Sequence, residues 1–245
     1  IRSKQGVYLT NYGKELFPYI KNVQNSEEYL QQAVAQIGGM EKGVVRIGTF
    51  NSACVEWMPS LLRGFEKDYP NIRIDIYQGS YDDVYQWLKD GIVDLGFLSS
   101  TSAGDLPCTP IYQDKIICVA PQGFKTKNEG YITIEELKKQ RFVTQREGCD
   151  ADVNHVMNKY DLPGGGGSYI ADDMSAVSLV MGGFGVCLMP ELVIRNIPFP
   201  VDVIPLEVEE KRTIVLAYVR SDVLAPAVQK MQSYILESFQ KKAEE

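Results

Sequence analysis

The sequence contains a single histidine, His155, and none of its five cysteines lies in a CxxC pair. A single histidine leaves little room for a histidine-based catalytic triad or a histidine-rich metal site, so both kinds of site are disfavoured. An odd number of cysteines without disulfide or metal spacing is typical of the reducing cytoplasm. We therefore predict a cytoplasmic protein without a metal or other cofactor, and we expect His155 to be an ordinary polar residue on a helix.

Long apolar runs are also missing. No stretch approaches 18 consecutive apolar residues, which argues against a membrane-spanning helix and a membrane partner. The segment from Ile1 to Gly6 has no apolar region of the kind found in signal peptides. The chain also begins without methionine and in the middle of a pattern, so we expect it to be a fragment.

Basic residues are fewer than acidic ones, 25 against 32, and the formal net charge is −7. DNA-binding domains are usually basic, because contacts to phosphates supply much of their affinity. The fragment is therefore predicted to bind DNA poorly on its own. Its 245 residues, 44% of them hydrophobic, are enough for one large or two small domains with a buried core.

The chain opens with the pattern of a long helix, for which Thr10 is the predicted N-cap. Its apolar positions alternate in steps of three and four, the heptad spacing of a coiled coil, and are interrupted once by Glu27. These positions are Leu16, Ile20, Val23, Leu30, Val34 and Ile37. Packing of the helix on its own domain is the alternative, but a heptad that ends at Gly38 favours dimerisation through a partner helix. Pro18 is expected to kink the helix unless the helix begins close to it.

After Gly43 the pattern changes to alternating strands and helices. Strands are predicted at 44–48, 72–77, 93–98 and 115–120, with helices at 58–69 and 81–89. Strands and helices that alternate in this way form βαβ units, so we expect a mostly parallel sheet.

A second series follows, with short helices at 134–139, 152–160 and 174–181 and a closing helix at 226–241. Strands are predicted at 142–144, 168–170, 186–189, 201–206 and 213–219. Thr133 and Glu136 have the spacing of a capping box. The glycines from Gly164 to Gly167 predict a flexible loop and no phosphate site, because the GK[ST] ending of a P-loop is missing.

Short motifs along nearly the whole chain, in order and at matching spacing, resemble those of LysR-type transcriptional regulators. Arg2, Gly6-Val7-Tyr8-Leu9-Thr10 and Gly13 resemble the end of that family's winged helix-turn-helix. Further segments resemble the motifs of its sensor region. They are Gly43-Val44-Val45-Arg46-Ile47-Gly48, Met58-Pro59, Leu62, Phe65, Tyr69-Pro70, Gly91, Val93-Asp94-Leu95-Gly96, Leu179-Val180, Gly182-Gly183-Phe184-Gly185-Val186 and Leu188-Met189-Pro190.

The resemblance implies an α/β fold of two Rossmann-like subdomains of the periplasmic-binding-protein type II, joined by two crossover strands and preceded by a long linker helix. Residues 1–12 would be the remnant of the wing and 13–42 the linker and dimerisation helix. Residues 43–120 with 221–245 would form regulatory subdomain I, and 121–220 subdomain II. The family's recognition helix would lie upstream of Ile1.

The function that this resemblance implies is ligand-responsive control of transcription. The partners would be a small-molecule effector, DNA through the missing N-terminal head, and further copies in a homodimer or tetramer, with RNA polymerase as an additional candidate. A stand-alone solute-binding protein of the same fold is the alternative. An enzyme is the third hypothesis and is disfavoured, because no acid–base pair, nucleophile–base pair or metal constellation is visible.

Ligands of open α/β sheets bind at the carboxyl ends of strands. The candidate effector-binding residues lie at such strand ends or at positions where the family holds its effectors. They are Asn51, Ser52, Ala53, Phe97, Ser99, Ser100, Thr144, Gln145, Arg146 and Asp172. Their hydroxyl and amide groups, with the guanidinium of Arg146, predict a small polar or anionic ligand. Phe50, Trp57, Tyr81 and Phe97 offer contacts for an apolar part. Ordinary loop polarity is the alternative for each of them.

Two of these candidates have a structural alternative. Asn51 and Ser52 are expected to cap the helix that follows them, leaving N–H groups free for a carboxylate. The pair Asp172-Asp173 is expected to cap the helix at 174, or to accept hydrogen bonds from an amine on the ligand.

Cys149 lies close to a predicted helix N-terminus, where a thiolate is favoured. Peroxide-sensing relatives carry a second cysteine shortly after such a residue, whereas the next cysteine here is Cys187. Asp150 and Asp152 also oppose a thiolate. We therefore do not expect Cys149 to sense redox state.

Overall fold

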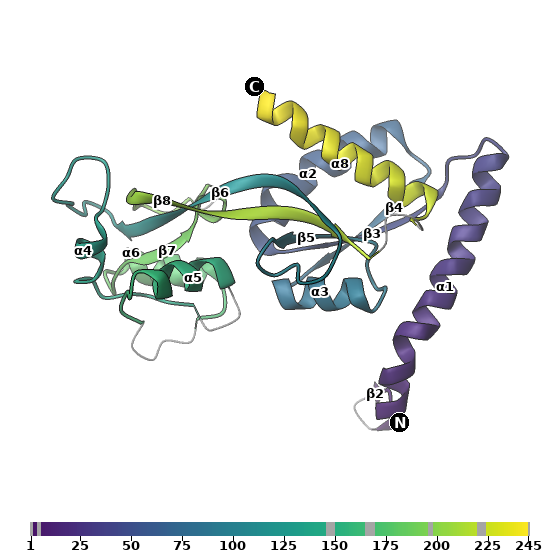
Figure 1. Ribbon diagram of the computed structural model, residues 1–245, viewed down its shortest axis with the longest axis horizontal. Coiled ribbons are helices and arrows are strands. Elements are labelled where there is room, and N and C mark those ends of the chain that lie inside the picture. Colours follow the sequence, from purple (N-terminus) through teal and green to yellow (C-terminus); the bar gives the residue numbers. More distant parts are fainter. Residues whose placement is uncertain are drawn as a thin grey trace.

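A computed structural model describes residues 2–3, 6–145, 150–164, 170–195, 198–219 and 224–244. The described elements form two lobes that are joined by two long strands, and a long helix stands to one side of the first lobe (Figure 1). No helix in these ranges is long and apolar enough to cross a membrane. The predicted loop at 164–167 lies outside them except for Gly164.

The long N-terminal helix is α1, Asn11–Ile37, and it follows a two-stranded ribbon of β1, Arg2–Ser3, and β2, Gly6–Val7. The predicted cap is confirmed, since the Thr10 hydroxyl accepts a hydrogen bond from the Gly13 N–H at 3.0 Å. Pro18 lies inside α1, and the helix continues through it as one element. Pro18 is past the first turn of α1, so it removes the backbone hydrogen bond to the carbonyl of Lys14 without ending the helix.

We call the first lobe lobe I. It consists of the parallel strands β4, β3 and β5, the hydrophobic core around them and the elements that pack on that core. Its elements are β3, Gly43–Thr49; α2, Asn51–Asp68; β4, Ile72–Gln78; α3, Tyr81–Lys89; β5, Leu95–Ser99; and the C-terminal α8, Pro226–Glu244. Phe65, Leu88 and Met231 are fully buried there. The C-terminal helix thus returns to the lobe that begins the sheet (Figure 1).

The predicted start of the second helix was wrong. The helix begins at Asn51 rather than at residue 58, because Ala53 and Trp57 already pack into the lobe I core. Pro59 sits inside it and removes the hydrogen bond to the carbonyl of Val55, a residue with a side chain on the exposed side of the helix.

The two lobes are joined by β6, Cys108–Pro121, and β8, Val201–Tyr218, which pair with each other antiparallel. The six-stranded sheet has the order β4-β3-β5-β8-β6-β7, so it is mixed and not mostly parallel as predicted. The predicted strands at 201–206 and 213–219 are parts of the single strand β8. Its middle, 207–211, is mostly exposed and polar because it spans the region between the lobes, and for this reason it lacked a strand pattern.

Lobe II consists of the two hydrophobic clusters on either face of the other end of β6 and β8. Its further elements are α4, Ile134–Leu137; α5, Ala151–Lys159; α6, Asp173–Met181; β7, Cys187–Pro190; and α7, Glu191–Ile194. The capping box of Thr133 and Glu136 is confirmed, and His155 is exposed on α5 as expected. The predicted strands at 142–144 and 168–170 are reduced to isolated bridges at Phe142, Gln145 and Ile170, with 168 and 169 outside the described residues.

The turn before β7 makes the first prediction. Gly185 has a φ of 148°, and a Cβ there would lie 2.3 Å from the carbonyl oxygen of Arg141. Gly185→Ala is expected to lower the free energy of unfolding by roughly 2–5 kcal/mol, because backbone strain and the clash add. Gly183→Ala, where φ is 79° and the space is open, is expected to cost about 1–2 kcal/mol. Urea unfolding measures both, and equal losses would contradict the prediction.

Candidate functional site

A cavity of about 530 Å³ lies between the two lobes, and we call it the cleft. Lobe I contributes the start of α2 and the segment that joins β4 to α3, and lobe II contributes residues near the starts of α5 and α6. The lining residues are Phe50, Asn51, Ser52, Gln78, Gly79, Ser80, Tyr81, Asp83, Gln145, Asp150, Ala171, Asp172, Asp173, Met174, Val193 and Arg212.

Arg212 lies at the base of the cleft, on β8, and is only 2% exposed. In the strand register it stands directly opposite Asp114 of β6. Its Nε and Nη2 atoms donate to Asp114 Oδ2 at 2.9 and 2.7 Å, a charge-assisted pair between the two connecting strands. The other carboxylate oxygen of Asp114 accepts from the Leu192 N–H at 3.0 Å, at the start of α7.

The same guanidinium also reaches two hydroxyl groups of lobe I. Nη1 donates to Tyr81 Oη at 2.7 Å, and Nη2 donates to Ser52 Oγ at 3.0 Å. The Phe50 ring lies 5.1 Å from the guanidinium carbon, within cation–π range. One side chain therefore links α2, α3, β6 and β8 at the cleft.

Burial affects the ionisation of the charged groups at this position. Burial alone would lower the pKa of Arg212. Tyr81 and the carboxylates of Asp150 and Asp114 favour the charged form more strongly, so the pKa of Arg212 lies above its ordinary value. Burial raises the pKa of Asp114 even though Arg212 favours its charged form. Burial also raises the pKa of Asp150 to about 6, because Arg212 is 4.0 Å away and offsets only part of the desolvation.

Two polar contacts cross the cleft from lobe to lobe. Asn51 Nδ2 donates to Asp173 Oδ2 at 3.3 Å, and Thr101 Oγ1 donates to Asp152 Oδ1 at 2.9 Å. Within lobe II, Gln145 Nε2 donates to Asp173 Oδ1 at 2.6 Å. In both contacts between the lobes, a neutral donor of lobe I meets a carboxylate of lobe II.

The helix ends at the cleft differ in how they are capped. The N-cap of α2 is Phe50, which has no capping oxygen, so the expectation that Asn51 and Ser52 cap this helix was wrong because both lie inside its first turn. By contrast, Asp172 caps α6, as predicted, by accepting from the Ser175 N–H at 2.9 Å. Among the described residues no side chain accepts from the first N–H groups of α2, and a helix N-terminus of this kind attracts anions.

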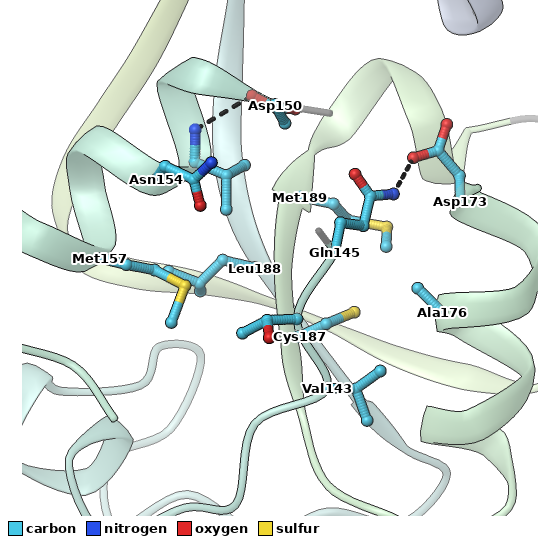
Figure 2. A pocket seen from close by; sticks show the side chains of 12 residues that line it. Val143, Gln145, Asp150, Asn154, Met157, Asp173, Ala176, Cys187, Leu188 and Met189 are labelled. Carbon is cyan, nitrogen blue, oxygen red and sulfur yellow. Dashed lines mark hydrogen bonds between the residues drawn. The ribbon is translucent and has the colours of Figure 1, made fainter. Parts of the chain in front are cut away.

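A smaller recess of about 20 Å³ lies inside lobe II, beside Gln145. Figure 2 shows the side chains of Val143, Met157 and Cys187 around it, and Gln145 pointing to Asp173 at its edge. Thr144 also lines this recess. Its size suits a methyl group or a water molecule, so it is an extension of the cleft and not a second site.

The predicted effector-binding residues thus separate into groups. Asn51, Ser52, Gln145 and Asp172 line the cleft, and Thr144 lines the recess. Ala53 and Phe97 are fully buried in the lobe I core. Ala53 lies in the first turn of α2, which starts earlier than predicted, and Phe97 lies within strand β5. Ser99 is buried against Thr101 and Ser100 is exposed, and neither lines the cleft. Arg146 and Cys149 lie outside the described residues.

Sequence reasoning missed Arg212 and Asp150 as cleft residues, whereas Asp173, considered together with Asp172, does line the cleft. Arg212 lies where the strand pattern failed, between two predicted strands. Asp150 stands at the start of α5, where an aspartate is explained by helix capping alone. A usable signal was that both missed residues lie beside a predicted strand or helix end.

The raised pKa of Asp150 predicts a pH-dependent stability. Its pKa of about 6 in the folded state lies above the ordinary value of 3.8, so its contribution to stability is present at low pH and is lost as the pH rises through 6. Asp150→Asn keeps a capping oxygen but cannot ionise. Relative to the parent, the unfolding free energy of this variant is expected to rise between pH 4 and pH 7, by up to about 3 kcal/mol.

Urea unfolding at several pH values measures this difference. Asp172→Asn is the matched control, because the N–H and hydroxyl of Ser175 hold the pKa of Asp172 below its ordinary value. Its relative stability should change with pH in the opposite direction. A pH-independent difference for Asp150→Asn would contradict the prediction.

Comparison with known proteins gives the chain its family. A model of the LysR substrate binding domain matches residues 38–240. The chain is 22% identical over 206 residues to the uncharacterized HTH-type transcriptional regulator YvbU of Bacillus subtilis, covering 84% of this chain and 70% of the relative. It is 24% identical over 249 residues to the transcriptional dual regulator GltC of the same organism, covering 98% of this chain and 82% of the relative.

Solved structures share the fold. The effector-binding domain of QuiR with shikimate superimposes with a TM-score of 0.72 at 19% identity, covering 82% of this chain and 98% of that one. The regulatory domain of CcmR from Synechocystis PCC6803 with 2-PG gives 0.74 at 16% identity, covering 81% and 98%. Full-length CbnR with its target DNA gives 0.70 at 13% identity, covering 98% and 85%. These neighbours confirm the predicted two-lobed fold of periplasmic-binding-protein type II, and the family model shows that the chain belongs to the LysR substrate-binding domains of transcriptional regulators.

Proposed function

We propose that the chain is the sensing part of a ligand-responsive LysR-type transcriptional regulator, and that its effector binds in the cleft between the lobes. The observation that carries this proposal is the cleft itself, a cavity of about 530 Å³ lined by polar groups from both lobes. QuiR and CcmR, which share the fold, were solved with shikimate and 2-PG. A small polar metabolite of similar size is the class of ligand that we infer.

The effector contacts that we propose come from both lobes. Asn51 and Ser52 stand at the uncapped N-terminus of α2, which suits an anionic oxygen. Gln145 and Asp172 face them from lobe II, and Thr144 lines the adjoining recess. Arg146 stays a candidate from the sequence.

Oligomerisation is proposed to use the apolar stripe of α1, which comprises Leu16, Ile20, Val23, Leu30, Val34 and Ile37. All six side chains are more than half exposed, from 56% to 89%. The polar side of α1 faces lobe I instead: Asn25 donates to the Gly91 carbonyl at 3.0 Å, and Glu28 pairs with Arg46 at 2.9 Å. A stripe of this size left facing water is typical of a protein interface, and its heptad spacing fits a second copy of the same helix.

The coupling of sensing to DNA follows from this arrangement. An effector that binds one arrangement of the lobes more tightly shifts the population toward that arrangement. Because α1 is packed on lobe I, a change in lobe I is transmitted through α1 to the segment that precedes this helix. Residues 1–12 would belong to the wing, 13–42 to the linker, 43–120 with 221–245 to subdomain I, and 121–220 to subdomain II. DNA would be bound through a head outside this chain, in the cytoplasm, and contact with RNA polymerase stays a prediction.

The regulator is favoured over a stand-alone solute-binding protein. Curated relatives that span most of this chain are transcriptional regulators, and α1 with its exposed stripe has no role in binding a solute. Catalysis is not proposed. Within the described ranges no three histidine, cysteine, aspartate or glutamate residues converge as metal ligands, and the cleft carboxylates already cap helices or accept amide hydrogens.

A thermal-shift screen of metabolites against this chain tests the sensing function. At a concentration about 100 times the Kd, the effector is expected to stabilise the protein by about 2.7 kcal/mol. Ser52→Ala should reduce the shift, because Ser52 lines the cleft. Ser178→Ala is the control, since that hydroxyl is exposed on α6 and bonds only to the Met174 carbonyl. The site assignment fails if the shift is the same in both variants.

Light scattering tests the proposed dimerisation. Leu30→Glu places a charge in the stripe of α1, and we expect it to lower the molecular mass in solution toward that of a monomer, because a charge buried between helices is unfavourable. Gln36→Glu adds the same charge at an exposed position of α1 outside the stripe and should leave the mass unchanged. A monomeric parent, or a dimer that Leu30→Glu does not affect, would contradict the proposal.

A further inference from the structure

The hydroxyl groups of Ser52 and Tyr81 are held as hydrogen-bond donors to the cleft. Both residues are only 5% exposed and both line the cavity. Each hydroxyl oxygen accepts a hydrogen bond from Arg212, which has donors only. Among the described residues no acceptor takes the hydrogen of either hydroxyl. A buried hydrogen-bond donor without an acceptor costs free energy, so we expect an acceptor for the two hydroxyl hydrogens inside the cleft.

Arg212 itself is not the counter-ion of that acceptor. Its Nε and Nη2 atoms are taken by Asp114, so the positive charge is compensated by a buried carboxylate behind the cleft wall. Two further N–H groups serve the two hydroxyls, and Nη1 also lies 4.0 Å from Asp150 Oδ2. Arg212 is therefore a positioning residue that fixes which way the hydroxyls of Ser52 and Tyr81 donate.

The wall that lobe II presents carries negative charge. Among the described residues, the hydrogen-bond donors to the Asp173 carboxylate are the neutral amides of Asn51 and Gln145. Asp172 accepts from Ser175, and Asp150 accepts from two backbone N–H groups of α5. No described lysine or arginine forms an ion pair with Asp172 or Asp173, and the cation nearest to Asp150 is Arg212 at 4.0 Å.

A ligand in the cleft thus meets mainly hydrogen-bond donors on the lobe I side, where Asp83 is the one carboxylate among the described lining residues and accepts from Ser80, and several carboxylates on the lobe II side. Ser52, Tyr81 and the N-terminus of α2 suit an oxyanion such as a carboxylate. The carboxylates of Asp150, Asp172 and Asp173 would repel a ligand that carried only negative charge, and they attract an ammonium group. The predicted Arg146 would add one positive charge and would leave carboxylates in excess.

We infer that the effector is a small zwitterion, with a carboxylate on Ser52 and Tyr81 and an ammonium group toward Asp150, Asp172 and Asp173. This inference rests on the proposed function, since it names the ligand class of the same cleft. It narrows the polar or anionic ligand expected from the sequence to an amino-acid-like compound.

Isothermal titration calorimetry with matched compounds tests the inference. The probes are the twenty proteinogenic amino acids, the carboxylic acids that lack their amino group, and the amines that lack their carboxylate. At least one amino acid is expected to bind, and both of its analogues should bind about tenfold more weakly or worse, because each loses a charge-assisted contact.

Charge-removing variants identify where each group binds. Asp173→Asn should weaken binding of the amino acid by about tenfold, while Asp161→Asn, at an exposed position with a φ of 51° that asparagine also adopts, should not. Tyr81→Phe should weaken the amino acid and its carboxylic acid analogue alike, but should leave the amine unchanged.

The outcomes separate this inference from the proposed function. Equal binding of an amino acid and its carboxylic acid analogue, or binding that Asp173→Asn leaves unchanged, would overturn the zwitterion. The zwitterion would also be overturned if only anions or neutral compounds stabilised the protein in the metabolite screen and their effect depended on Ser52. The sensing function would then still stand. If no compound in either experiment binds, both fail.

Discussion

The ion pair between Asp114 and Arg212 is the contact on which the arrangement of the cleft depends. The two residues face each other on β6 and β8, midway along the strands that join the lobes, and both are almost fully buried. Burying two charges costs several kcal/mol per ion, and this cost is offset only where geometry is good and the remaining donors are satisfied. Here Tyr81 and Ser52 satisfy them, so the pair ties α2 and α3 to the connecting strands.

This constraint gives the cleft two unlike walls. The lobe I wall is fixed from behind by Arg212 and presents hydroxyl and helix N–H donors beside the carboxylate of Asp83, whereas the lobe II wall presents several carboxylates at helix starts. Asn51 reaches Asp173 across the gap, so a ligand that enters there competes with a contact between the lobes. Because α1 packs on lobe I with its apolar stripe outward, a change in the lobes would reach the interface that we propose for this stripe.

The sequence predicted the parts of this molecule that local patterns specify. Thr10 as a cap, the capping box of Thr133 and Glu136, and the bounds of α3 from Tyr81 to Lys89 all follow from spacing within one turn or one helix. The continuity of β8 was not predictable, because 207–211 is mostly polar and exposed, and the register with β6 shifts within it, from Glu210 opposite Ile116 to Pro205 opposite Ile117. Arg212 was missed for that reason, and Phe97 was misplaced because a strand end alone does not reveal which face its side chain takes.

A double-mutant cycle of Asp114→Leu and Arg212→Met, followed by urea unfolding, tests the central claim most directly. If the pair organises the base of the cleft, Arg212→Met alone should cost about 3–5 kcal/mol, because it leaves Asp114 buried without its partner. The double variant should then be more stable than Arg212→Met, since no isolated charge remains. Losses that simply add would show that the two residues act independently, and would contradict the account.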